Sequence, residues 1–127
     1  MLFGPKTKKK LEKTLIDKHK FVLDKQTSNL KREAENLTQR VHFFRWFTDI
    51  TILPKCYIDA DYLEDIEKLL NIWAVQLDDR LSVAFIYDDR IEFELKEDIN
   101  SVNADYIVYL VDKITEKLNT LPEIKSE

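Results

Sequence analysis

Two Asp-Asp-Arg triplets, at residues 78–80 and 88–90, are the most chemically suggestive groups in this sequence. Adjacent carboxylates can bind a divalent cation. The two pairs, however, bracket a predicted strand, which places them about 20 Å or more apart at about 3.3 Å per residue. Because metal ligands lie within about 2.5 Å of their ion, the pairs cannot share one site. Asp88 and Asp89 are better explained as a tight turn, which aspartate tolerates.

The first acidic pair could still approach a second one at the open end of the same predicted hairpin. That group is the one acidic cluster with a chance of binding Mg²⁺ or Ca²⁺, and its members are Asp78, Asp79, Glu97 and Asp98. No glycine-containing calcium loop accompanies it. Charged side chains in loops are usually solvated, so we expect a charged rim here and predict no metal site.

Residues typical of catalysis occur without the spacing that catalysis needs. His19 and His42 lack the metal-ligand spacings of zinc sites, and nothing beyond residue type connects either histidine to Cys56. The isolated Gly4 cannot supply a phosphate-binding loop, a dinucleotide fingerprint or a nucleophile elbow. We therefore predict no catalytic residues, no cofactor and no enzymatic activity.

Charge divides the sequence into two unlike parts. Residues 1–45 contain twelve Lys/Arg and five Asp/Glu, a net charge of +7, whereas residues 46–127 contain eight and nineteen, a net charge of −11. A basic front and an acidic back predict either two surfaces with different partners or two halves that neutralise each other.

The strongest local charge is a run of lysines near the start of the chain. Positive charge at a helix amino terminus opposes the macrodipole, so an anion covering this segment would stabilise it. That anion could be nucleic acid, lipid or the acidic part of another copy, although the acidic back half repels a polyanion. The candidate anion-binding residues are Lys6, Lys8, Lys9, Lys10, Lys13, Arg32 and Arg40.

An apolar stripe follows the lysines. Apolar residues recur at steps of three and four from Leu11 to Phe44, and no Pro or Gly interrupts residues 6–53. The pattern predicts one basic helix over residues 1–40, starting near Thr7 and roughly 50 Å long at about 1.5 Å per residue. The rest of the chain is too short to cover it, so part of it should protrude, pair with a second copy or lie on a partner. Its partner-binding candidates are Leu11, Leu15, Val22, Leu30 and Leu37.

Residues 41–121 are predicted to form a compact body, and residues 122–127 a loose tail. The aromatic segment 43–47 is interpreted as core, and whether residues 41–47 are helix or strand stays open. A short strand should end at Pro54, and a helix should begin near Asp61 with Glu64 as its capping partner. A hairpin over 81–95 and a helix from Asn103 to before Pro122 follow.

The predicted fold is therefore α+β in a single domain. A long N-terminal helix precedes a small antiparallel sheet of about three strands with two further helices, in the order α-β-α-β-β-α.

The function predicted from these features is non-catalytic protein interaction or regulation, of the adaptor, chaperone or inhibitor type. It would act through the long helix and the acidic α+β face, as a homodimer that buries the apolar stripe. The alternative is a nucleic-acid accessory protein that uses the basic helix. No apolar segment resembles a secretion signal or a membrane span, which predicts a cytoplasmic protein.

Overall fold

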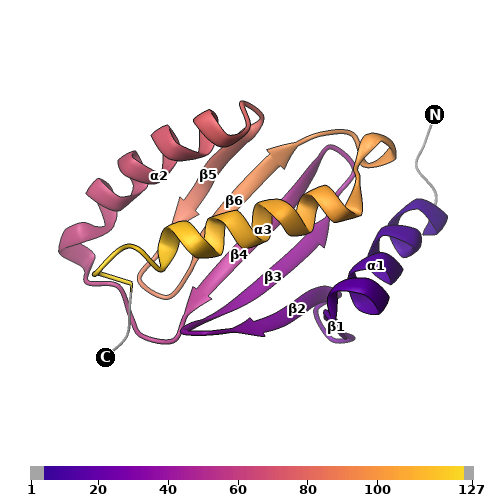
Figure 1. Ribbon diagram of the computed structural model, residues 1–127, viewed down its shortest axis with the longest axis horizontal. Helices are drawn as coiled ribbons and strands as arrows, with labels where there is room; N and C mark the ends of the chain where they lie inside the picture. The colour runs from indigo at the N-terminus through magenta and orange to yellow at the C-terminus, as the bar shows by residue number, and fades with distance from the viewer. Residues whose placement is uncertain (1–4, 125–127) are drawn as a thin grey trace.

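The computed structural model describes residues 5–124, which form six antiparallel strands and three α-helices in the arrangement of Figure 1. In chain order the elements are α1 (Pro5–His19), β1 (Val22–Asp24), β2 (Asn29–Ala34), β3 (Leu37–Phe43), β4 (Phe47–Pro54), α2 (Leu63–Leu77), β5 (Leu81–Ile86), β6 (Ile91–Lys96) and α3 (Ala104–Leu118). Short 3₁₀ turns at Ala60–Tyr62 and Ile99–Ser101 precede α2 and α3. None of these helices is long and apolar enough to cross a membrane.

The strands form one sheet in the order β1-β2-β3-β4-β6-β5. The first four follow one another as a meander, and α2 then carries the chain to the far edge. There β5 forms a hairpin with β6, and β6 pairs with β4, so the hairpin is joined to the first four strands in one sheet. Helix α3 crosses the middle of one face, while α1 and α2 flank it along the two edges (Figure 1).

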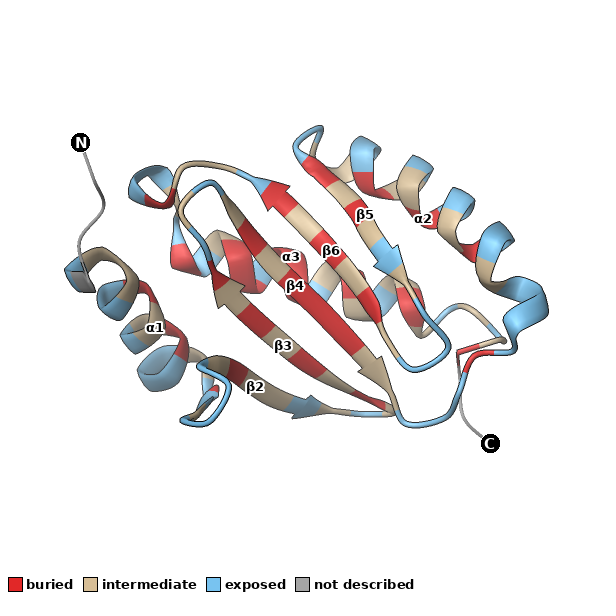
Figure 2. Ribbon diagram, turned by 180° about the vertical axis from the view of Figure 1, so that it is seen from behind, coloured by how far each residue is buried: buried red, intermediate tan, exposed pale blue. Residues whose placement is uncertain are grey.

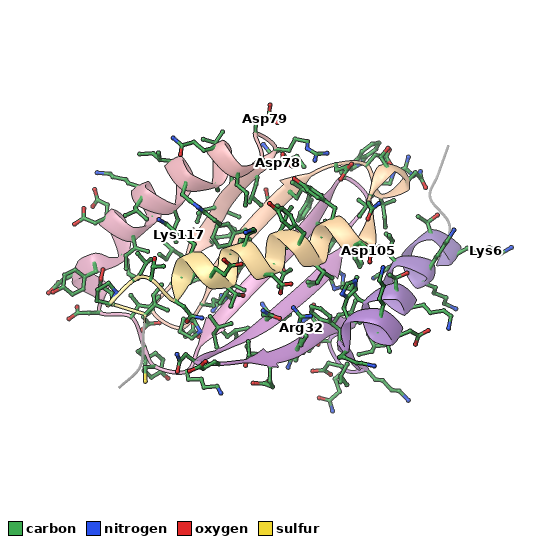
Figure 3. All side chains as sticks on the ribbon, in the orientation of Figure 1. Lys6, Arg32, Asp78, Asp79, Asp105 and Lys117 are labelled. Atoms are coloured by element: carbon green, nitrogen blue, oxygen red, sulfur yellow. The ribbon has the colours of Figure 1, made fainter. Side chains whose placement is uncertain are left out.

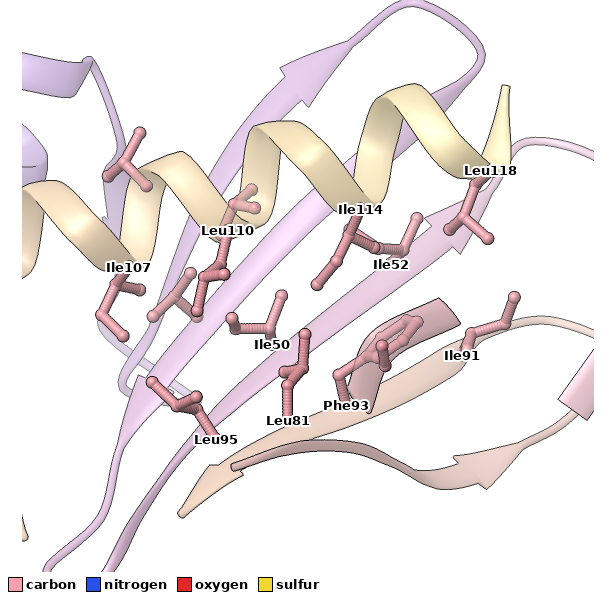
Figure 4. Packing of buried hydrophobic residues seen from close by; sticks show 14 of the residues in the cluster. Ile50, Ile52, Leu81, Ile91, Phe93, Leu95, Ile107, Leu110, Ile114 and Leu118 are labelled. Carbon is pink, nitrogen blue, oxygen red and sulfur yellow. The ribbon is translucent and has the colours of Figure 1, made fainter. Parts of the chain in front are cut away.

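The core lies between α3 and the central strands (Figure 4). Apolar residues of α3 recur at steps of three and four, so they form one stripe that meets the sheet. The strands alternate, so every second side chain of β4 and β6 points at that stripe. Fully buried residues of this layer include Ile50, Ile52, Phe93, Leu95, Leu110 and Ile114.

The predicted long helix is wrong. Helix α1 ends at His19, and residues 22–54, which were expected to continue it and then form one short strand, form four strands. The chain turns at three non-glycine residues with positive φ: Lys20 at 67°, Ser28 at 60° and Asn36 at 69°. Because these turns use no glycine or proline, the usual signals of interruption are absent from the sequence.

The predicted element order α-β-α-β-β-α and the predicted number of strands are also wrong, whereas the α+β class is confirmed. The sheet has six strands where about three were expected, and three further strands precede the single early one. The apolar strand β5 lies at the edge of the sheet. Helix α2 covers it, and the Val83 N–H donates to Asn71 Oδ1 at 2.9 Å. Ile124, in the predicted loose tail, is buried against the core, and residues 125–127 lie outside the described part.

A buried polar bridge ties the sheet to α3. Gln39 on β3 is 2% exposed, and its amide oxygen accepts from Arg32 Nε at 2.7 Å. Its amide nitrogen donates to Thr115 Oγ1 on α3 at 2.9 Å. The Arg32 guanidinium also donates to the His19 carbonyl at 3.1 Å and to Asp112 at 2.6 Å, so one residue links β2, α1 and α3.

Replacing Gln39 with Leu should lower the free energy of unfolding by about 1–3 kcal/mol, because Arg32 Nε then loses its buried acceptor. Urea unfolding followed by circular dichroism measures this. Thr38→Val on the opposite face of the same strand is the matched control, and it should change stability by less than about 0.5 kcal/mol. Equal effects of the two variants would show that the bridge contributes little.

Candidate interaction site on the open face of the sheet

No helix within residues 5–124 covers one face of the sheet. Figure 2 shows this open face, with the strands in front of α3 and partly buried or exposed positions alternating with buried ones. Strand pairing lines up its residues in two neighbouring cross-strand rows. The first row is Asn29, His42, Asp49, Glu94 and Ser82, and the second is Lys31, Arg40, Thr51, Glu92 and Phe85.

Aromatic side chains border this face on two sides. Phe44 stacks on Phe47 with ring centroids 4.7 Å apart, and Phe85 stacks on Tyr87 at 6.0 Å. Between them lies an open groove of about 460 Å³, within the range of about 300–1,000 Å³ typical of ligand sites. Its lining residues include Arg40, His42, Phe47, Asp49, Phe85, Glu92 and Glu94.

Asp49 is the electrostatically unusual group of this groove. Its pKa is raised from 3.8 to about 6, mainly by burial and to a smaller extent by the nearby carboxylates of Glu92 and Glu94. The Thr51 hydroxyl donates to Asp49 at 2.9 Å and, with Arg40, acts in the opposite direction. Within residues 5–124, Asp49 forms no ion pair. Below about pH 6 the Asp49 carboxyl is therefore protonated and neutral, and it needs no cationic partner.

The β3 side of the groove is basic. His42 Nδ1 lies 3.0 Å from Asn29 Oδ1, and its Nε2 lies 3.5 Å from Lys8 Nζ. Burial lowers the pKa of His42, and the charges of Lys8 and Arg40 lower it further. A neutral imidazole that donates from Nδ1 and accepts at Nε2 satisfies both contacts. The open face is thus positive along β3 and negative along β4 and β6.

The predicted anion-binding residues do not form one surface. Lys6, Lys9 and Lys10 are exposed on α1, and Figure 3 shows Lys6 projecting away from the body. Lys13 pairs with Asp17 at 2.6 Å on α1. The remaining three are separated from these: Lys8 and Arg40 reach the groove, and Arg32 faces α3. Nucleic-acid binding stays an untested alternative, and it would rely on the exposed lysines of α1.

The predicted partner-binding residues are mostly inside the protein. Leu11, Leu15, Leu30 and Leu37 are buried in the core, so they are not accessible to a partner in this fold. Val22 is 68% exposed on the edge strand β1. The structure therefore separates the five residues that the helical stripe had placed on one surface.

Three of the four acidic residues considered as a metal site contact arginines. Arg80 contacts Asp78 at 2.8 Å and Glu97 at 3.1 Å, and the Tyr106 hydroxyl also donates to Asp78. Asp98 lies 3.7 Å from Arg45, while Asp79 is exposed (Figure 3). In the described part of the chain, no three His, Cys, Asp or Glu side chains are grouped so that they could hold a metal ion.

Sequence reasoning missed the residues that line the groove. Asp49 and Glu94 come from elements far apart in the chain and meet only through the β4–β6 register. The aromatic segment interpreted as core is divided: Phe43 is buried, whereas Phe44 is 42% and Trp46 64% exposed. The alternation of Glu92 and Glu94 with apolar residues was the available signal, because such alternation is typical of a strand with one solvated face.

Comparisons with protein-family models, curated proteins and solved structures found no match to this chain.

Asp49→Asn should raise the free energy of unfolding at pH 7 by about 1–2 kcal/mol. The raised pKa means that folded Asp49 binds a proton up to about pH 6, whereas the unfolded chain releases it near pH 4. Wild-type stability therefore loses this contribution as pH rises from about 4 to 6, and Asn does not titrate. Urea unfolding at pH 4 and pH 7 measures the difference, which should vanish at pH 4. Glu116→Gln on α3 is the control, and an equal gain from it would contradict the assignment.

Proposed function

We propose that the protein is a non-catalytic interaction protein that binds a segment of another protein on the open face of its sheet. The observation that carries the proposal is a sheet face without a covering helix that is bordered by exposed aromatic rings. Phe85 is 54% and Phe44 42% exposed, and large aromatic side chains dominate the energetic centres of protein interfaces. Exposed apolar patches on folded proteins commonly mark such contacts.

The polar floor of the groove supports the same proposal. Interfaces combine aromatic anchors with charged groups that set orientation and select the partner. Here the positive β3 side and the negative β4–β6 side would align an incoming segment in one direction across the strands. An adaptor, a chaperone and an inhibitor would each bind a segment of the partner protein in this groove.

A photocrosslinking experiment tests the position of the binding surface. Phe85→benzoylphenylalanine places a photoreactive ring of similar shape in the groove wall. Tyr109→benzoylphenylalanine is the matched control, because Tyr109 is 47% exposed on α3, behind the sheet. Irradiation in an extract of the source cell should give a discrete stoichiometric product from position 85 that position 109 does not give. Crosslinking from neither position, or equally from both, would contradict the proposal.

Self-association is a separate part of the proposal, and it uses α2. The C-terminal part of this helix, residues 69–77, contains no charged residue. It exposes Leu69, Ile72 and Val75, of which Ile72 is 63% exposed. A second copy fits such a face, because two identical uncharged stripes meet across a two-fold axis without repulsion. We infer that α2 forms the centre of a homodimer.

Ile72→Asp should convert the dimer to a monomer, because the interface would then bury two like charges without partners. Static light scattering measures the mass, and circular dichroism checks that the fold is kept. Ile16→Asp on α1 is the control, since this residue is also partly exposed on a helix but lies away from α2. A monomeric unmodified protein at high concentration would overturn the inference.

A further inference from the structure

Asp49 and Glu94 form a like-charged pair on the open face. They are directly opposite in the β4–β6 ladder, where side chains on one face lie about 4.5–5.5 Å apart at Cβ. Like charges in this position destabilise a sheet. Neither carboxylate has an ion-pair partner within residues 5–124. The neighbouring Glu92 does, because Arg90 Nε contacts it at 2.8 Å.

The other charged groups around Asp49 do not complete this pair. Arg40 and His42 face Asp49 from β3, and Glu92 and Glu94 face it from β6. Arg40 lies beyond ion-pair distance of any carboxylate, and its Nε has no hydrogen-bond partner among the described residues. His42 is occupied by Asn29 and Lys8. Asp49 and Glu94 thus line the groove without an ion-pair partner among the described side chains.

Arginines elsewhere in the chain show which cation fits such a position. Arg32 lies over the Phe21 ring at 4.6 Å and contacts Asp112 at 2.6 Å. Arg90 lies over the Tyr87 ring at 4.1 Å and contacts Glu92. The third case is Arg45, over Trp46 at 4.6 Å and 3.7 Å from Asp98. Each guanidinium is held by an aromatic face and a carboxylate together.

The groove offers the same combination, but its own arginine, Arg40, forms no ion pair with a carboxylate of the described residues. Phe47 and Phe85 supply the aromatic faces, and Asp49 and Glu94 supply the carboxylates. A planar guanidinium can donate to two carboxylate oxygens while its face lies on a ring, which a compact ammonium cannot do.

We propose that the open face binds an arginine side chain of a partner protein, with its guanidinium between Asp49 and Glu94 and an apolar neighbour against Phe85. Charge complementarity selects this occupant, since two unpaired carboxylates lie in an aromatic-lined groove. The inference rests on the proposed function, because it names the chemistry of the segment that the open face would bind. The raised pKa of Asp49 agrees with it, because in the free protein a proton neutralises this carboxylate below about pH 6.

The test uses a minimal probe, acetyl-Arg-Phe-amide, in titrations of the full-length protein followed by NMR. The Asp49 carboxyl resonance should show a pKa that falls from about 6 towards its ordinary value when the probe saturates the groove. By linkage, a fall of about two pH units makes the probe bind about tenfold more tightly at pH 7 than at pH 5. Amide shift changes should be confined to the open face.

Matched probes and variants isolate the guanidinium. The neutral isostere acetyl-citrulline-Phe-amide should bind at least tenfold more weakly at pH 7. Asp49→Asn and Glu94→Gln should each weaken binding of the arginine probe several-fold, and Asp49→Asn should also remove the pH dependence. Glu116→Gln on α3 removes one carboxylate behind the sheet and should leave binding unchanged.

Two results would overturn this inference: equal binding of the arginine and citrulline probes, or an Asp49 pKa that stays near 6 at saturation. The proposed function would survive both if position 85 still gave its crosslinked product, so failure of the arginine site is distinguishable from failure of the open face as an interaction surface.

Discussion

The packing of α3 on the central strands is the interaction on which the rest of the structure depends. Its stripe of buried residues covers β4 and β6, the two strands that join the early meander to the late hairpin. Without that cover the inner faces of both strand groups would be exposed together, at a cost of about 25 cal/mol per Å² of apolar surface. The helix therefore determines which face of the sheet becomes the core and which face stays open.

The charge division of the sequence has a structural counterpart in contacts between its two halves. Lys18 and His19 on α1 contact Asp105 on α3, and Arg32 contacts Asp112 on the same helix. Arg45 similarly contacts Asp98. The partly exposed pairs contribute little stability individually, but together they orient α1 and β2 relative to α3. Part of the basic front is thus neutralised by the acidic back within one molecule.

The open face is where this neutralisation stops. Arg40 on β3 supplies positive charge to this face, whereas the carboxylates of Asp49, Glu92 and Glu94 are neighbours on β4 and β6. If every charged side chain on this face formed an ion pair within the protein, the face would offer no charge to a partner. The unpaired carboxylates, the aromatic borders and the missing helix cover coincide at one place, and that coincidence makes this face the candidate site.

The sequence by itself determined the elements with strong local signals. Helix α3 begins after Asn103, whose side chain accepts from the Tyr106 N–H at 3.1 Å, and the β5–β6 hairpin turns at the two aspartates. Helix α2 forms where a helix was predicted, but the predicted Asp61–Glu64 cap is wrong: the helix begins at Leu63, and its N-cap Tyr62 makes no side-chain capping hydrogen bond. In α3 and the hairpin, the capping residue, the turn residues and the hydrophobic period all favour one structure, so neighbours in the chain carry enough information.

Only the tertiary structure decided that residues 22–54 form strands instead of a helix, and which residues line the groove. Apolar residues at steps of three and four fit a helix, yet strands that alternate around turns at Ser28 and Asn36 produce similar spacing. Pairing with β6 and burial under α3 select the strands, and both partners lie far along the chain. Asp49 and Glu94 likewise become neighbours through backbone register alone. Register depends on hydrogen bonds between distant segments, which no local pattern of residues encodes.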